Sequence, residues 1–219
     1  MRRRAHQSRQ RVEPVDPALR AYLLDAAFRF IDTIREWHGI VRIALIGSLT
    51  TDKPNPKDVD LLVTVDDDLD LTALAKHSRK LKGMTQQNSN HGTDVFLANP
   101  DGQYIGRVCL WRECAPGIRV SCDARNCGAR TYLHDDLDAI QLSMELVANP
   151  PIQVFPRVEC RVVVPADVQP FLSKYQAEAD SPKSRLPRGR RRKSRQRTIG
   201  AIRSSRPSFA QSSEFSKKR

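Results

Sequence analysis

Apolar and polar residues follow a helical period in the first part of the chain. After Asp16 and Pro17, apolar side chains recur every three or four positions as far as Trp37, and Gly39 follows. An aspartate cap, a proline in the first turn and a glycine after the last turn are the usual boundaries of a helix. The pattern therefore predicts an amphipathic helix over residues 16–37.

Strand patterns follow this helix and alternate with a second helical segment. Leucines spaced along one helical face predict a helix over residues 68–82, ended by Gly83. Runs rich in apolar and β-branched residues predict strands over 40–46, 59–65, 93–98 and 104–110. This mixture predicts an α/β (α+β) fold, in which a small mixed sheet is flanked by helices.

The hydrophobic pattern weakens in the second half of the chain. A sparse apolar stripe predicts a helix over 135–147, with Asp135 and Asp136 capping its start, and 152–164 predicts one or two more strands. Trp37 and Trp111 are interpreted as core or subdomain contacts. The predicted organisation is a basic, disordered N-terminus, a folded domain, a Cys-rich segment that completes the fold, and a linker with a disordered tail, over 1–15, 16–108, 109–165 and 166–219 respectively.

Charge changes this picture, because it is concentrated at one end. The 219 residues carry a net charge of +12, of which residues 181–219 contribute +13 through fourteen Lys or Arg and the single acid Glu214. The remaining residues sum to −1. The run RLPRGRRRKSRQR has no aromatic residue, so it predicts non-specific contact with nucleic-acid phosphates; a solvated tail without a dedicated partner is the alternative.

Targeting signals are not evident in the sequence. The basic residues at the start are followed by no apolar segment, and no apolar run approaches the ~20 residues that cross a bilayer. We therefore expect no membrane association and a cytoplasmic location, where cysteines are thiols or metal ligands rather than disulfides.

Candidate chemistry begins with the stretch IGSLTTDKPNPKDVDLL, in which two aspartates bracket one valine at the start of an apolar strand. Asp58 and Asp60 point the same way, because strand residues alternate faces. Two carboxylates side by side repel each other unless a cation lies between them, and Mg²⁺ prefers such oxygen ligands. A third carboxylate, Asp94, opens the strand TDVFLA. The simpler alternatives are a solvated strand edge for the pair and a turn cap for Asp94.

The motif consists of Gly-Ser, nine residues, Asp-apolar-Asp-apolar and a later Asp. It resembles the motif of the nucleotidyltransferase superfamily related to DNA polymerase beta, particularly of its minimal members. The resemblance covers residues 40–98. The resemblance implies a nucleotidyltransferase-like domain in which Gly47 and Ser48 bind a nucleotide triphosphate. It also implies that Asp58 and Asp60 bind two Mg²⁺ ions, and that Asp94 binds one of them and helps to activate the acceptor. The three carboxylates must then share one sheet face.

The sequence departs from the minimal members after the Gly-Ser turn. Leu49 stands where an arginine is common, and Pro54 and Pro56 interrupt the segment where a helix begins. Phosphate contact is therefore predicted from Lys53 or Lys57. The resemblance implies an enzyme that transfers a nucleoside monophosphate from a nucleotide triphosphate to a hydroxyl. The alternative is a catalytically inactive module that binds nucleic acid or a protein partner, as in a toxin–antitoxin pair.

Four cysteines lie close together in the segment CLWRECAPGIRVSCDARNC. Their spacing suits either a structural Zn²⁺ site, with His134 as a substitute ligand, or separate structural thiols. Cys160, the fifth, is interpreted as a packing residue. The candidate zinc ligands are Cys109, Cys114, Cys122 and Cys127.

Overall fold

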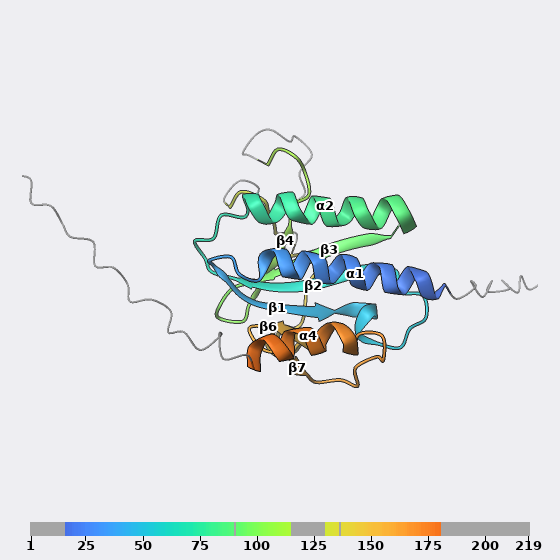
Figure 1. Ribbon diagram of the computed structural model, residues 1–219. Helices are drawn as coiled ribbons and strands as arrows, with labels where there is room; N and C mark the ends of the chain where they lie inside the picture. The colour runs from blue at the N-terminus through green and yellow to red at the C-terminus, as the bar shows by residue number, and fades with distance from the viewer. Residues whose placement is uncertain (1–15, 90, 115–129, 136, 181–219) are drawn as a thin grey trace, which may run out of the picture. The chain divides into compact units, whose positions relative to one another are not determined.

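The computed structural model describes residues 16–89, 91–114, 130–135 and 137–180 (Figure 1). Within these ranges the chain forms a mixed α+β fold, which is the class that the sequence predicts. It has seven strands in one sheet and four α-helices. The helices are α1 (Pro17–Ile34), α2 (Thr72–Ser89), α3 (Met144–Ala148) and α4 (Gln169–Asp180). The strands are β1 (Ile40–Ile46), β2 (Asp58–Val65), β3 (Gly92–Ala98), β4 (Tyr104–Val108), β5 (Leu133–His134), β6 (Ile152–Phe155) and β7 (Glu159–Cys160).

The strands are ordered β5-β4-β3-β2-β1-β6-β7. β2 and β3 are parallel, and every other neighbouring pair of this sheet is antiparallel. α2 connects the parallel pair, because two adjacent parallel strands need a crossover between them. The first residues of β2 and β3 consequently lie at the same end of these two central strands.

The two faces of the sheet differ in how they are covered. α1, α2 and α4 share one hydrophobic core with the first face, where Val59 and Leu61 of β2 are fully buried (Figure 1). Asp60 alternates with these residues and is in phase with Leu62, so it belongs to the second face. The buried apolar residues of that second face form a small cluster of Ala44, Ile46, Leu62, Phe96, Ala98 and Val147.

The start of α1 agrees with the sequence analysis, and the end of α2 does not. The Asp16 carboxylate accepts a hydrogen bond from the backbone N–H of Ala18 at 3.0 Å, which caps α1 as predicted. α2 does not end before Gly83, as the sequence analysis expected, but continues to Ser89. An internal glycine costs a helix only ~1 kcal/mol relative to alanine. The extra turn buries Thr85, whose hydroxyl lies 3.0 Å from that of Thr93 in β3.

The prediction of a linker directly after residue 165 is wrong, because α4 occupies Gln169–Asp180. The Phe171 ring stacks on Phe28 of α1 with 4.6 Å between centroids. The Tyr175 hydroxyl donates to Asp32 at 2.8 Å. Leu172 is buried in the same core. This helix therefore belongs to the folded domain.

Two predictions for the segments around these elements need correction. The helix predicted over 135–147 is wrong for most of its length: α3 begins only after Ser143, which caps it, and Val147 is its one fully buried residue. Asp135 caps no helix, and Asp136 lies outside the described residues.

The two tryptophans differ in their surroundings. Trp37 packs edge-on against His77, as expected of a core contact. Trp111 is 58% exposed, so its interpretation as a core contact is wrong.

Candidate functional site

The three carboxylates singled out by the sequence lie on two adjacent parallel strands. Asp60 of β2 is the register partner of Asp94 of β3. Asp58 precedes Asp60 by two residues and therefore faces the same side. Neighbouring strands are ~4.8 Å apart, so the three side chains share one small region of the less covered sheet face.

Gly47 brings the turn after β1 against this group. Ile46, the last residue of β1, pairs with Asp60, and Gly47 follows with a φ of +69°. A Cβ atom on Gly47 would lie 2.2 Å from Oδ2 of Asp60, closer than real atoms approach. Glycine is therefore required here both by its conformation and by the carboxylate beside it.

Gly92 does the same for the second carboxylate, and the sequence analysis missed it. Its backbone N–H donates to Oδ1 of Asp58 at 2.9 Å, and a Cβ atom would lie 2.4 Å from that oxygen. The available signal was the glycine in HGTD, two residues before Asp94. Each of the two β2 aspartates thus has a glycine packed against its carboxylate.

The electrostatics of the group are unfavourable without a cation. Burial first, and then the negative charges of Asp58 and Asp94, raise the pKa of Asp60 to about 7. A carboxyl group with this pKa is largely protonated below neutral pH, because its ionised form is poorly solvated and repelled. A divalent cation among these oxygens would remove that cost.

The side chains fit Mg²⁺ by their chemistry, but their oxygens are not gathered around one point. Among the described residues, no group of three or more His, Cys, Asp or Glu side chains is arranged to hold a metal ion. Two of the carboxylates have protein partners instead: Gly92 binds Asp58, and the Arg107 guanidinium lies 3.2 Å from Oδ1 of Asp94. Oxygen ligands on one face remain the set that Mg²⁺ prefers.

Arg107 is the second residue of the site that sequence reasoning missed. It lies on β4, where its register partner is Phe96, so it shares a sheet face with Asp94. A lone arginine in a strand pattern gives no local signal of this contact. Its positive charge offsets one of the three carboxylates in the metal-free protein.

The turn that follows β1 is short and well anchored. Gly47–Thr50 form one 3₁₀ turn, in which Leu49 and Thr50 are buried and Ser48 is half-buried. The Thr50 hydroxyl donates to the Gly47 carbonyl at 2.8 Å. No α-helix follows the turn before β2, in agreement with the prolines of that segment. Lys53 and Lys57, the predicted phosphate contacts, are both exposed on the loop.

Arg20 of α1 holds this loop from behind, and it was not predicted. The residue is 7% exposed, and its guanidinium donates to the backbone carbonyls of Leu49 and Lys53, each at 3.1 Å. It also forms an ion pair with Asp167, which precedes α4. A buried cation satisfied in this way fixes the shape of the loop between β1 and β2.

The structure describes half of the predicted zinc ligands. Cys109 and Cys114 are both buried, and Sγ of Cys114 accepts a hydrogen bond from the Tyr132 N–H at 3.3 Å. Cys122 and Cys127 lie outside the described residues, so the zinc site stays a prediction. His134 is half-buried in β5, next to β4. Cys160 is exposed on the edge strand β7, so its interpretation as a packing residue is wrong.

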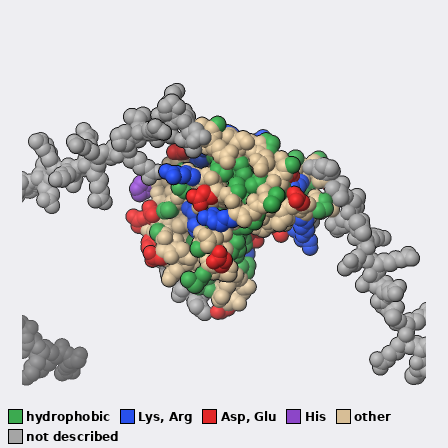
Figure 2. Space-filling view, turned by 90° about the horizontal axis from the view of Figure 1, so that it is seen from below, with side chains coloured by type: hydrophobic (Ala, Val, Ile, Leu, Met, Phe, Trp, Pro, Cys, Tyr) green, Lys and Arg blue, Asp and Glu red, His purple; other side chains and the backbone are tan. Residues whose placement is uncertain are grey.

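The face of the described part that is seen in Figure 2 is mixed in charge. Acidic and basic side chains lie interspersed around apolar areas, rather than in one large patch of a single sign (Figure 2). The predicted basic tail lies outside the described residues. None of the helices in the described ranges combines the length and the apolar character needed to cross a membrane.

Comparison with known proteins gives one partial match. Residues 8–114 match the model of a family of unknown function, DUF6932. The match spans the three carboxylates, Gly47 and Arg20. No curated protein and no solved structure matches the chain significantly. The chain is thus similar, from its N-terminal region through β4, to a family whose function is itself unknown.

Proposed function

We propose that this protein is a Mg²⁺-dependent nucleotidyltransferase whose domain is similar to the minimal relatives of DNA polymerase beta. The observation that carries the proposal is that Gly47, in the turn after β1, packs against Asp60 of β2, whose register partner is Asp94 of β3. Asp58 lies on the same face. A close turn beside clustered carboxylates suits a triphosphate bound through Mg²⁺.

In the proposed reaction, an oxygen of the acceptor hydroxyl bonds to the α-phosphorus of the nucleotide. The bond from that phosphorus to the bridging oxygen breaks, pyrophosphate leaves, and the hydroxyl proton is released to a base. Asp94 is the residue proposed to orient the acceptor and receive this proton, while the backbone at Gly47 and Ser48 binds the triphosphate. Asp58, Asp60 and Asp94 would hold Mg²⁺, which supplies charge neutralisation to both the attacking and leaving oxygens.

The test uses purified full-length protein, α-labelled nucleotide triphosphates, Mg²⁺ and a mixture of candidate acceptors. We expect pyrophosphate release that the double substitution Asp58→Asn and Asp60→Asn abolishes without unfolding the protein. Asp101→Asn is the matched control, because Asp101 is exposed in the turn after β3. A folded protein that releases no pyrophosphate and binds no Mg²⁺ contradicts the proposal.

A catalytically inactive module is the second candidate, and two observations favour it. Arg107 already neutralises Asp94. The loop after Gly47 also lacks the helix that the minimal nucleotidyltransferases begin there. Such a module would bind nucleic acid or a protein partner, for example in a toxin–antitoxin pair. Calorimetry with a non-hydrolysable nucleotide separates the two: binding that depends on Mg²⁺ supports the enzyme, and its absence supports the module.

A further inference from the structure

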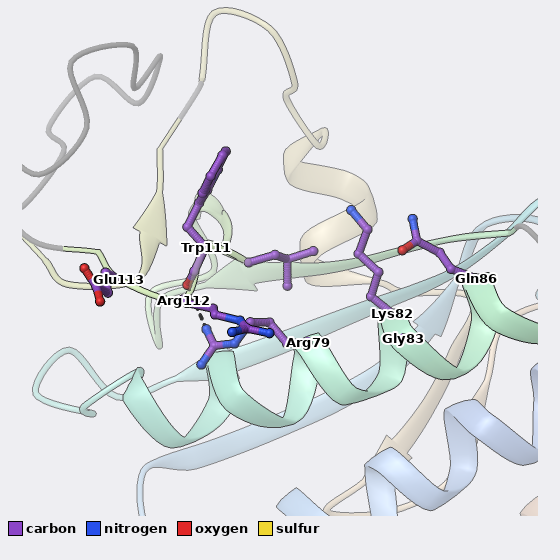
Figure 3. Close-up of a pocket in the computed structure, with 8 residues that line it drawn as sticks. Arg79, Lys82, Gly83, Gln86, Trp111, Arg112 and Glu113 are labelled. Atoms are coloured by element: carbon purple, nitrogen blue, oxygen red, sulfur yellow. Dashed lines mark hydrogen bonds between the residues drawn. The ribbon is translucent and has the colours of Figure 1, made fainter.

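A groove beside α2 is not explained by the carboxylate site. It has a volume of about 790 Å³, within the ~300–1,000 Å³ typical of ligand pockets. One wall is the face of α2 that carries Arg79, Lys82 and Gln86, and the other is the segment after β4 that carries Trp111 and Arg112 (Figure 3). Both walls come from described residues of the folded domain.

The groove combines positive charge with an exposed aromatic ring. Arg79, Lys82 and Arg112 give it three cations, against one acid, Glu113. Trp111 is 58% exposed, and Arg79 donates to its backbone carbonyl at 2.9 Å, which fixes the tryptophan segment to the helix. Cations that bind phosphates and aromatic rings on which bases stack are the two components of single-strand binding.

The polar side chains that α2 contributes to the groove, two cations and one amide, form a row rather than one cluster. Arg79, Lys82 and Gln86 are spaced by three and four residues, so they lie on one helical face. At 1.5 Å per residue they extend over ~10 Å along the helix. A row of this length suits successive phosphates of a chain better than the single phosphate group of a free nucleotide.

A cavity lined by Asp94 adjoins the groove. Lys82 and Trp111 line a second, smaller cavity of about 160 Å³, whose other walls include Asp94, Arg107 and His134. The two cavities therefore share wall residues, so a linear ligand in the groove lies next to the cavity that contains Asp94. Trp111 and the α2 cations all lie within the residues that match the family model.

We propose that this groove binds the single-stranded end of a nucleic acid, with a base stacked on Trp111 and phosphates on Arg79, Lys82 and Arg112. If the proposed function holds, the terminal hydroxyl of this strand is the acceptor at Asp94. Only this acceptor role rests on the proposed function. The binding site itself includes no residue of the basic tail and none of the residues proposed to bind the nucleotide.

Gly83 provides a test that spares the fold. The groove passes over it, and a Cβ atom built there meets nothing within 4 Å. Gly83→Leu should fill the groove with a better helix former, so stability should be kept or raised. Gly83→Ala is its control for helix propensity, and Lys76→Ala is the control for charge, because Lys76 is exposed on α2 and does not line the groove.

The binding experiment uses the full chain without Mg²⁺ or nucleotide, at ~150 mM salt, and follows the anisotropy of labelled RNA and DNA single strands of ~12 nucleotides. Trp111→Ala and Gly83→Leu should each weaken single-strand binding by about 5- to 100-fold, the factor expected from losing one stacked base. Lys82→Ala should lower the slope of log K against log salt by about one unit. Both control variants should bind like the unmodified chain.

Parallel ligands identify other occupants. A duplex of the same length measures binding by the basic tail, and its affinity should not change in Trp111→Ala. The inference is overturned if Trp111→Ala loses equal affinity for duplex and single strand, or loses affinity for neither. It is also overturned if the protein binds a nucleoside monophosphate or an acidic peptide more tightly than the single strand. Asp58→Asn with Asp60→Asn should bind the strand normally, so failure of catalysis and failure of the groove give different results.

Discussion

The side chains of β2 have different roles on the two faces of the central sheet. On the face covered by helices, Val59 and Leu61 of β2 are fully buried in the main core. On the other face, Asp58 and Asp60 alternate with them and meet Asp94. Stability therefore depends on one set of side chains, and the candidate chemistry depends on a second set one residue out of phase.

The difference shows how a repulsive site is tolerated. Three carboxylates in one region oppose folding unless they are protonated or paired with a cation. β2 is hydrogen-bonded on both edges and buried on its other face, so the backbone holds the aspartates in register despite their repulsion. Substitutions on the two faces should consequently have opposite effects, and the predictions below test this from the largest effect to the smallest.

Leu61→Ala should destabilise the protein by about 2–5 kcal/mol, because it removes a fully buried side chain from the core. Asp60→Asn, one residue away, should leave stability unchanged or raise it. Urea denaturation of both variants measures the difference. If Asp60→Asn costs as much as Leu61→Ala, the division between the two faces is wrong.

Arg20→Met should destabilise the protein by about 2–3 kcal/mol, less than the ~3–5 kcal/mol of a fully buried pair because Asp167 is 42% exposed. The substitution leaves the Leu49 and Lys53 carbonyls without their donor, so nucleotide binding should weaken as well. Thermal denaturation and calorimetry measure the two effects. Arg29→Met is the control, since Arg29 forms an exposed pair with Asp25 and should change stability by less than ~0.5 kcal/mol.

Sequence patterns predicted the part of the fold that depends on local periodicity. The predicted strands 40–46 and 93–98 lie within one residue of β1 and β3. The Gly-Ser pair lies in the turn after β1, and Asp58 begins β2. α4 was missed although Val168, Phe171, Leu172 and Tyr175 have helical spacing. Polar residues and Pro170 interrupt this apolar pattern, and only tertiary packing on α1 shows that the face is buried.

The contacts that complete the site were beyond local sequence signals. Arg20, Gly92 and Arg107 each act across at least 13 positions of sequence, on Leu49, Asp58 and Asp94 respectively. A single arginine or glycine gives no pattern until the strand order is known. Trp111 shows the converse, since a tryptophan interpreted as a core or subdomain contact is 58% exposed.

The pH dependence of stability isolates Asp60. The pKa of this group in the folded protein is raised to about 7 from a usual value of 3.8, so the folded state binds its proton more tightly than the unfolded state does. Stability should fall as pH rises from ~4 to ~7 and then level off, by about 1–2 kcal/mol after allowance for solvent screening. Denaturation curves of the metal-free protein and of Asp60→Asn measure this difference. Identical pH profiles for the two proteins would contradict it.

Arg107→Gln should have the smallest effect on stability and the most informative effect on function. The ion pair with Asp94 is partly exposed, at 28% and 36% of the two side chains, so its loss should cost no more than ~1 kcal/mol. Removing the cation takes this partner away from the Asp94 carboxylate while keeping a polar side chain at the position. In an enzyme, Arg107 competes with Mg²⁺ for Asp94, so the substitution should tighten Mg²⁺ binding in calorimetry. In an inactive module Arg107 replaces the metal, and calorimetry should then show no Mg²⁺ binding to the unmodified protein or to Arg107→Gln. That result would mean that the two sheet faces differ in charge and not in a catalytic role.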